Sequence, residues 1–168
     1  MSWDIFECPV CGNDEMVIPS GPSRANILII GEFPGKDEII HGKPLVGPTG
    51  RIMRKELAYL GVDMNRMRIT NLWQHRPNKN EECYKRGCAE AIKEAKGRKA
   101  ILLVGSDTLK YFCDKSVKAV CGLQVTSHYL SAPIIYATIN PASLFQRGGV
   151  GEVRLALTKF VKAVEDLL

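Results

Sequence analysis

The feature that most constrains the fold is the run Ile27-Leu28-Ile29-Ile30, which leads directly into a loop rich in glycine and proline. A short, continuous apolar run is typical of a strand that is buried on both faces of a parallel sheet. The glycines of residues 31–50 let the backbone approach a ligand, and the prolines fix φ along the loop. Because open α/β sheets bind ligands at the carboxyl ends of their strands, we expect the functional site in this loop.

The loop matches neither of the common phosphate-binding motifs. It lacks the Gly-Lys-Ser/Thr of a P-loop, and it lacks the Gly-x-Gly-x-x-Gly of a dinucleotide site. A long loop that is stiffened by proline is nevertheless usually functional. The sequence therefore indicates a binding site of another kind.

Three later apolar segments, residues 67–73, 100–105 and 133–139, have the character of further buried strands. Apolar residues at helical spacing follow each strand, at 49–60, from Cys88, from Ser106 or Asp107, and from about Gly151. Strands that alternate with helices favour a parallel sheet with helices on both faces. The sequence thus predicts an α/β fold with three layers, α/β/α, around a central four-stranded parallel sheet.

Length and charge set broad limits on what the protein does. A chain of 168 residues suits a single domain spanning 1–168, and its net charge of +5 favours an acidic partner such as DNA. No run of 18 apolar residues and no secretory signal pattern occur. We therefore expect a cytoplasmic monomer, encoded by a prokaryote or a virus, with no membrane association.

Cysteine spacing indicates a metal centre. The segment Cys8-Pro9-Val10-Cys11-Gly12 forms a knuckle whose two thiolates can point at one centre, which makes half of a site. An intracellular α/β domain of this size does not need disulfides. We expect residues 1–26 to form an N-terminal cluster-binding segment, in which residues 13–26 are a linker to the first strand.

Four segments of the chain together resemble a known family. They are Gly31-Glu32-Phe33-Pro34-Gly35, Gly42-Lys43-Pro44-Leu45-Val46-Gly47, Thr70-Asn71-Leu72-Trp73-Gln74-His75-Arg76-Pro77 and Asn140-Pro141-Ala142-Ser143-Leu144-Phe145-Gln146-Arg147. The pattern is similar to that of the family 4 uracil-DNA glycosylases, the iron-sulfur members of the uracil glycosylase superfamily, and it spans nearly the whole chain. The resemblance implies a uracil-DNA glycosylase-like fold and DNA containing uracil as the partner.

The resemblance also implies roles for individual residues. Asn71 would pair with the edge of a flipped-out uracil, in a base-binding site completed by Gly31, Phe33 and Leu45. Asn140 stands where the family has a histidine that donates to uracil O2, and Leu45 stands where the family has a phenylalanine that stacks on the base. The catalytic candidates are Asn140, Glu32 and Glu38, and the candidates for DNA binding are Ser143, Leu144, Phe145 and Arg147.

The ligand set of the expected metal centre stays open. The resemblance places the family's third cysteine at His75 and its fourth at Cys88, while an additional thiol, Cys83, lies between them. Two sets are possible, Cys8, Cys11, Cys83 and Cys88, or Cys8, Cys11, His75 and Cys88. An all-thiolate set suits a [4Fe-4S] cluster, which the family carries, whereas a set with histidine also suits zinc.

The function that we expect is a DNA glycosylase that hydrolyses the N-glycosidic bond of uracil, or of a related modified pyrimidine, and so initiates base excision repair. The alternative is a catalytically weak or inactive superfamily member that binds DNA or a modified base. This alternative is suggested by Phe33, Leu45 and Asn140, where the sequence departs from the family pattern. A third hypothesis is a metal-dependent enzyme that processes nucleotides on the same sheet.

Overall fold

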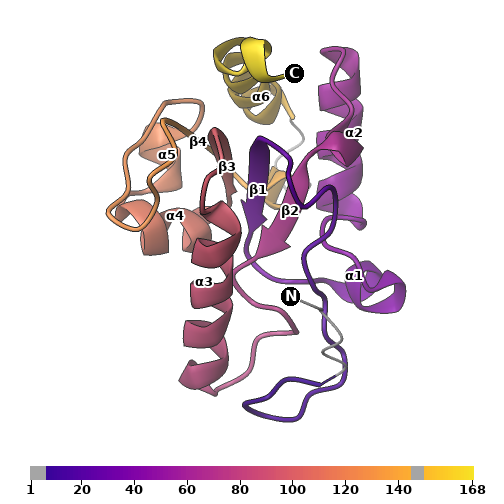
Figure 1. Cartoon of the computed structure of the whole chain (residues 1–168). Coiled ribbons are helices and arrows are strands. Elements are labelled where there is room, and N and C mark those ends of the chain that lie inside the picture. Colours follow the sequence, from indigo (N-terminus) through magenta and orange to yellow (C-terminus); the bar gives the residue numbers. More distant parts are fainter. Residues whose placement is uncertain (1–6, 145–149) are drawn as a thin grey trace.

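The computed structural model describes residues 7–144 and 150–168. Its four strands form one parallel sheet in the order β2-β1-β3-β4 (Figure 1). The strands are β1 (Ile27–Gly31), β2 (Arg68–Asn71), β3 (Ala100–Val104) and β4 (Ile134–Thr138). The helices are α1 (Lys36–His41), α2 (Pro48–Tyr59), α3 (Glu81–Ala95), α4 (Ser106–Cys113), α5 (Val117–Val120) and α6 (Gly151–Ala163), with 3-10 turns at Met64–Arg66, Pro141–Leu144 and Glu165–Leu167.

Alternate residues of β1 divide the core into two halves. Ile27 and Ile29 pack against α2 and α6 on one face, where Leu57 and Phe160 are fully buried. Leu28 and Ile30 point the other way, into a cluster that α3 and α4 cover. Successive side chains of a strand face opposite sides, so an unbroken apolar run is what a sheet covered on both faces requires. The predicted three-layer α/β/α fold is therefore confirmed (Figure 1).

Two local expectations were wrong. The helix after the second strand was expected to begin at Cys88, but α3 begins at Glu81. Asn80 caps this helix by accepting a hydrogen bond from the Glu82 backbone N–H, and two glutamates in the first turn suit the positive end of the helix dipole. The glycine loop also contains a short helix, α1.

The segment before β1, which was expected to be a linker, pairs with the edge strand β2. Ser20 and Ile69 of β2 exchange backbone hydrogen bonds of 2.9 and 2.8 Å as an isolated antiparallel bridge. Val17 N donates to Gln74 O at 2.6 Å, beyond the end of β2. This pairing covers an otherwise open sheet edge and directs the chain that precedes it toward the loop between β2 and α3.

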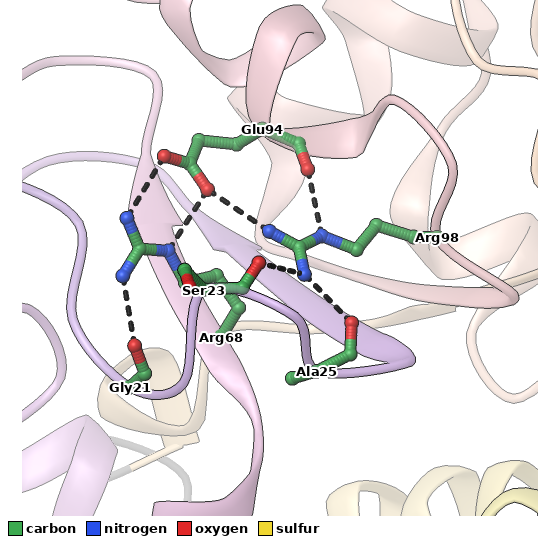
Figure 2. A network of polar contacts seen from close by, with 6 residues as sticks. All are labelled: Gly21, Ser23, Ala25, Arg68, Glu94 and Arg98. Carbon is green, nitrogen blue, oxygen red and sulfur yellow. Dashed lines mark hydrogen bonds and ion pairs between the residues drawn. The ribbon is translucent and has the colours of Figure 1, made fainter. Parts of the chain in front are cut away.

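A buried ionic network fixes the same segment to α3 (Figure 2). Glu94 accepts from Arg68 Nε at 2.9 Å and Nη2 at 3.0 Å, and it also pairs with Arg98 Nη2 at 3.2 Å. The two arginines donate onward to backbone carbonyls of residues 21, 23 and 25. The Glu94 side chain is 10% exposed, so its charge depends on these partners rather than on water.

Removing the shared carboxylate should destabilise the whole fold. In Glu94→Ala, two guanidinium groups lose their counter-ion in a largely dry environment, and we expect the free energy of unfolding to fall by about 3 kcal/mol. Lys85→Ala removes an exposed pair with Glu82 on the same helix and should leave the free energy of unfolding almost unchanged. Urea denaturation monitored by circular dichroism measures both, and equal effects in the two variants would contradict the role given to Glu94.

Within the described residues, no helix combines the length and apolar character that crossing a bilayer requires.

Candidate functional site

The site is formed where β1 and β2 end side by side. Gly31 and Asn71 are partners in the parallel register of these two strands. A Cβ atom placed on Gly31 would lie 2.5 Å from Asn71 Oδ1, which is closer than atoms can pack. Glycine at position 31 therefore makes room for the Asn71 carboxamide, which is 4% exposed.

A pocket of about 220 Å³ opens at this end of the sheet. Pockets for drug-sized ligands typically hold 300–1,000 Å³, so this one suits a smaller group such as a single ring. All the residues predicted for base binding or catalysis line it: Gly31, Glu32, Phe33, Glu38, Leu45, Asn71 and Asn140. The structure thus brings together residues that lie more than 100 positions apart in the chain.

Glu32 and Asn140 are joined by a hydrogen bond across the pocket. Asn140 Nδ2 donates to Glu32 Oε1 at 3.1 Å, and the Asp107 backbone N–H at the start of α4 donates to Glu32 Oε2 at 3.1 Å. Burial raises the pKa of Glu32 above its ordinary value, although these two donors act in the opposite direction. The two donors therefore offset only part of the cost of placing a charged carboxylate in this buried position.

The orientation of the Asn140 amide is fixed by its oxygen. Asn140 Oδ1 accepts from Thr49 Oγ1 at 2.7 Å and from the Ala142 backbone N–H at 3.0 Å. These contacts identify the other side-chain atom as the amide nitrogen, which carries two hydrogens and gives only one to Glu32. The second N–H remains available to an acceptor in the pocket.

Glu38 has a role that the sequence did not indicate. Its carboxylate accepts backbone hydrogen bonds from Gly35 at 2.9 Å, from Val46 at 3.1 Å, and from Gly47. The side chain is 9% exposed. Both oxygens of Glu38 are therefore bound to the loop backbone and hold the loop around the pocket.

Leu45 forms part of the pocket wall in an unusual backbone conformation. Its φ is +53°, a region that non-glycine residues adopt at a cost of about 1–3 kcal/mol. The conformation is held by Arg54, whose Nη1 donates to Leu45 O, and by Gly50, where a Cβ atom would lie 1.7 Å from that oxygen. Phe33, in contrast, is 44% exposed at the mouth of the pocket.

The segment after Asn140 is only partly described. Ser143 is exposed and its Oγ donates to the Asn140 backbone carbonyl at 2.7 Å, within the turn Pro141–Leu144. Phe145 and Arg147 lie outside the described residues. Ser143 does not line the pocket itself; with Glu32 and Asn140 it lines a neighbouring hollow.

Four potential metal ligands lie together beside the connection between β2 and α3. The Sγ atoms of Cys8, Cys11 and Cys83 and a ring nitrogen of His75 are all within 4.8 Å of one another. The knuckle contributes the first two, the loop after β2 contributes His75, and the first turn of α3 contributes Cys83. His75 and Cys83, which were expected to compete for one position, therefore occur together.

Cys88, which both expected ligand sets contained, lies elsewhere. It follows Cys83 by five residues on α3, and a helix turns by about 140° over that interval. Since Cys83 faces the knuckle, Cys88 faces the sheet, where it is fully buried in the apolar cluster. Burial raises the pKa of its thiol to about 11, against the opposing effect of hydrogen bonds from Tyr84 and Tyr111.

Backbone amides favour the thiolate form of the knuckle. Burial raises the pKa of Cys8, but hydrogen bonds from the Cys11 and Val10 backbone N–H groups, together with those from the His75 and Cys11 side chains, outweigh this effect and lower it to about 6. Burial and the neighbouring thiols raise the pKa of Cys83 to about 11. Closely spaced thiolates repel one another, and a bound cation relieves that repulsion.

Comparison with known proteins places the chain in a family. Residues 18–168 match the family model of the uracil DNA glycosylase superfamily. The chain belongs to this superfamily. A type-4 uracil-DNA glycosylase from Sulfurisphaera tokodaii is 28% identical over 158 residues, which cover 83% of this chain and 72% of that protein.

Two shorter alignments show higher sequence identity to this chain. Type-4 uracil-DNA glycosylases from Archaeoglobus fulgidus and Saccharolobus solfataricus are 37% and 41% identical over 62 and 63 residues. These matches span 37% of this chain in each case, and only 31% and 29% of the two relatives. The resemblance noted from the sequence motifs is confirmed at the level of the superfamily.

Three contributors to the site escaped the sequence analysis. Thr49 and the Asp107 backbone N–H fix Asn140 and Glu32, while the Asn78 side chain donates to the sulfurs of Cys11 and Cys83 at 3.7 and 4.0 Å. Thr49 lies within the glycine motif and could have been considered on that ground. A backbone N–H leaves no signal in a sequence, because every residue other than proline has one.

Proposed function

We propose that this protein is a DNA glycosylase that hydrolyses the N-glycosidic bond of uracil, or of a related modified pyrimidine, in DNA and so initiates base excision repair. One observation carries the proposal: Gly31 and Asn71, which end β1 and β2, and Asn140, which follows β4, line a single pocket of a size that suits one ring. Membership of the uracil DNA glycosylase superfamily and the type-4 names of the relatives support it.

Asn71 would recognise the base. A carboxamide can donate to O4 of uracil and accept from N3–H at the same time, which a cytosine edge does not permit with the same orientation. Asn71 is buried, so an unmatched base would leave its polar atoms without partners and without water. Gly31 supports this role because the absence of a side chain lets the base approach the strand end.

Asn140 would stabilise the departing base. Cleavage of the glycosidic bond places negative charge on uracil O2, and a fixed donor that is aimed at this oxygen lowers the barrier. The second N–H of Asn140 Nδ2 is suited to this task because contacts to the side-chain oxygen hold the amide in place. Backbone amides in the Gly31–Phe33 segment would add to the same oxyanion site.

Glu32 would act on the sugar side of the reaction. Its carboxylate is held by Asn140 and by the start of α4, at the pocket wall. A negative charge there would steady the cationic sugar and orient the attacking water. The hydrogen bond between Glu32 and Asn140 would link these two parts of the catalytic site, so that a change in one residue affects the other.

The remaining residues would hold DNA and stabilise the fold. Ser143 and Leu144, with Phe145 and Arg147 outside the described residues, follow Asn140 directly and would contact the strand from which the base is extruded. We propose that Cys8, Cys11, His75 and Cys83 hold a metal centre, for which the family resemblance implies a [4Fe-4S] cluster and zinc is the alternative. None of the four lines the pocket, which argues for a structural role.

The function is tested with defined oligonucleotides. Duplexes with uracil opposite guanine or adenine, and single strands with uracil, are incubated with the protein and then treated with alkali, which cleaves DNA at an abasic site. We expect scission at uracil, and scission at thymine or cytosine that is slower by about 10⁴-fold or more but measurable under excess enzyme. Absence of scission on every substrate would reject the glycosylase assignment.

A second candidate function is favoured by two features of the pocket. The Asn140 amide is already bound to Glu32, and Leu45 offers the base an aliphatic wall where an aromatic ring would stack. Both features favour a protein that binds a modified base and turns it over slowly or not at all. Retention of uracil DNA in a gel-shift assay, without scission after alkali, would support this alternative.

A further inference from the structure

The spacing of the four ligand atoms distinguishes between the possible metal centres. Cys8 Sγ and Cys83 Sγ are 3.9 Å apart, and Cys11 Sγ and His75 Nε2 are 3.6 Å apart. A single tetrahedral zinc ion, with bonds of about 2.3 Å to sulfur and about 2.0 Å to nitrogen, separates two sulfurs by about 3.8 Å and a sulfur from a nitrogen by about 3.5 Å. The observed distances agree with this geometry.

A four-iron cluster does not fit the same arrangement. In a [4Fe-4S] centre each protein ligand binds a different iron and lies outside the cluster, so the whole cluster separates the ligands. Here all four ligand atoms lie within 4.8 Å of one another. That distance leaves space for one metal ion between the ligands, but none for four irons and four sulfides.

The donor set points in the same direction. Three cysteines and one histidine form a common structural zinc site, closed by four protein ligands. The thiol that the family resemblance assigns as the fourth cluster ligand, Cys88, is buried against Tyr84 and Tyr111 on another side of α3. Cys8 and Cys11 also precede residues 18–168, the range that matches the superfamily, so the match does not bear on the knuckle.

Contacts around the ligands support a metal-bound arrangement. His75 Nδ1 donates to the Arg76 carbonyl at 2.8 Å, which places the ring proton on Nδ1 and leaves the Nε2 lone pair directed at the centre. Asn78 Nδ2 donates to Cys11 Sγ and lies 4.0 Å from Cys83 Sγ. Such donors partly neutralise thiolates and fix their orientation.

We infer that Cys8, Cys11, His75 and Cys83 bind one tetrahedral Zn²⁺ ion, in place of the iron-sulfur cluster that the family resemblance implies. The ion joins the N-terminal segment to the loop after β2 and to the first turn of α3. The loop after β2 begins directly after Asn71, which lines the pocket. The zinc ion therefore fixes the chain segment that leads away from the pocket. The inference does not depend on the proposed activity.

Metal content tests the inference directly. The chain is produced with iron and zinc both supplied and purified without oxygen, so that a cluster would survive. We expect elemental analysis to find one equivalent of zinc and no stoichiometric iron or sulfide, in a colourless protein. After exchange, Co²⁺ should give the visible bands of a tetrahedral thiolate site. Stoichiometric iron and sulfide with a brown colour would overturn the inference, as would failure to bind either Zn²⁺ or Co²⁺.

Two sets of variants assign the ligands. Cys83→Ser and His75→Ala should each weaken Co²⁺ affinity by more than about 100-fold, since loss of a direct ligand exceeds the 10–100-fold that an outer contact costs. Cys88→Ala is the matched control on the same helix and should retain one equivalent of zinc. Loss of the metal from Cys88→Ala, with the fold retained by circular dichroism, would contradict the proposed ligand set.

Discussion

Asn140→Ala is expected to lower the single-turnover rate of uracil excision by about 100- to 1000-fold, which is the usual cost of removing one fixed donor to a developing oxyanion. The structure supports a large effect because Thr49 and the Ala142 backbone N–H hold the Asn140 amide in one orientation before any substrate binds. Excision from a duplex with uracil opposite guanine, under excess enzyme, measures the chemical step without product release.

The expected loss should appear in the rate and not in DNA binding. Asn140→Ala removes a contact that strengthens only as charge develops on the base, so the dissociation constant for uracil DNA should change little. Asn140→His introduces the donor found at this position in the family 4 pattern and should restore much of the activity. An Asn140→Ala protein that is within about threefold of the unaltered rate would exclude Asn140 from the oxyanion site.

The fold was predictable from the sequence because its signals are local. Four apolar runs identify the strands, and the helices between them imply a parallel sheet. The central position of β1, between β2 and β3, is not local and came only from the structure. The edge position of the Ser20 segment depends on backbone pairing with Ile69, which residue types do not specify.

The candidate site was predictable only where residue identity decides the chemistry. Gly31, Asn71 and Asn140 were identified from motif positions, and they do line one pocket. The contacts of Glu38 could not be predicted because its partners are backbone amides, which residue types do not specify. The candidate metal ligands could not be predicted without knowing where α3 begins. Because the helix begins at Glu81, Cys83 faces the knuckle and Cys88 faces the sheet.

Asn71→Asp should abolish the selection of uracil. A carboxylate at position 71 can no longer donate to O4 of uracil, and its charge would be buried beside that acceptor. Sites built to hydrogen-bond a substrate group reject the unmatched partner by about 10⁴-fold or more, so we expect uracil excision to fall by that order. The amino group of cytosine is a donor, so excision of cytosine should lose far less, and the ratio between the two bases is the quantity to measure.

The ratio of the uracil excision rate to the cytosine excision rate distinguishes a defect in base recognition from damage to the fold. Misfolding lowers the rates on both bases equally, whereas the loss of a specific hydrogen bond changes their ratio. Asn65→Asp, the same change at an exposed position in the turn before β2, is the control and should leave both rates as they were. If Asn71→Asp lowered both rates in proportion, Asn71 would be a structural residue. The base would then have to be read by the loop of residues 31–50, which supplies most of the other residues that line the pocket.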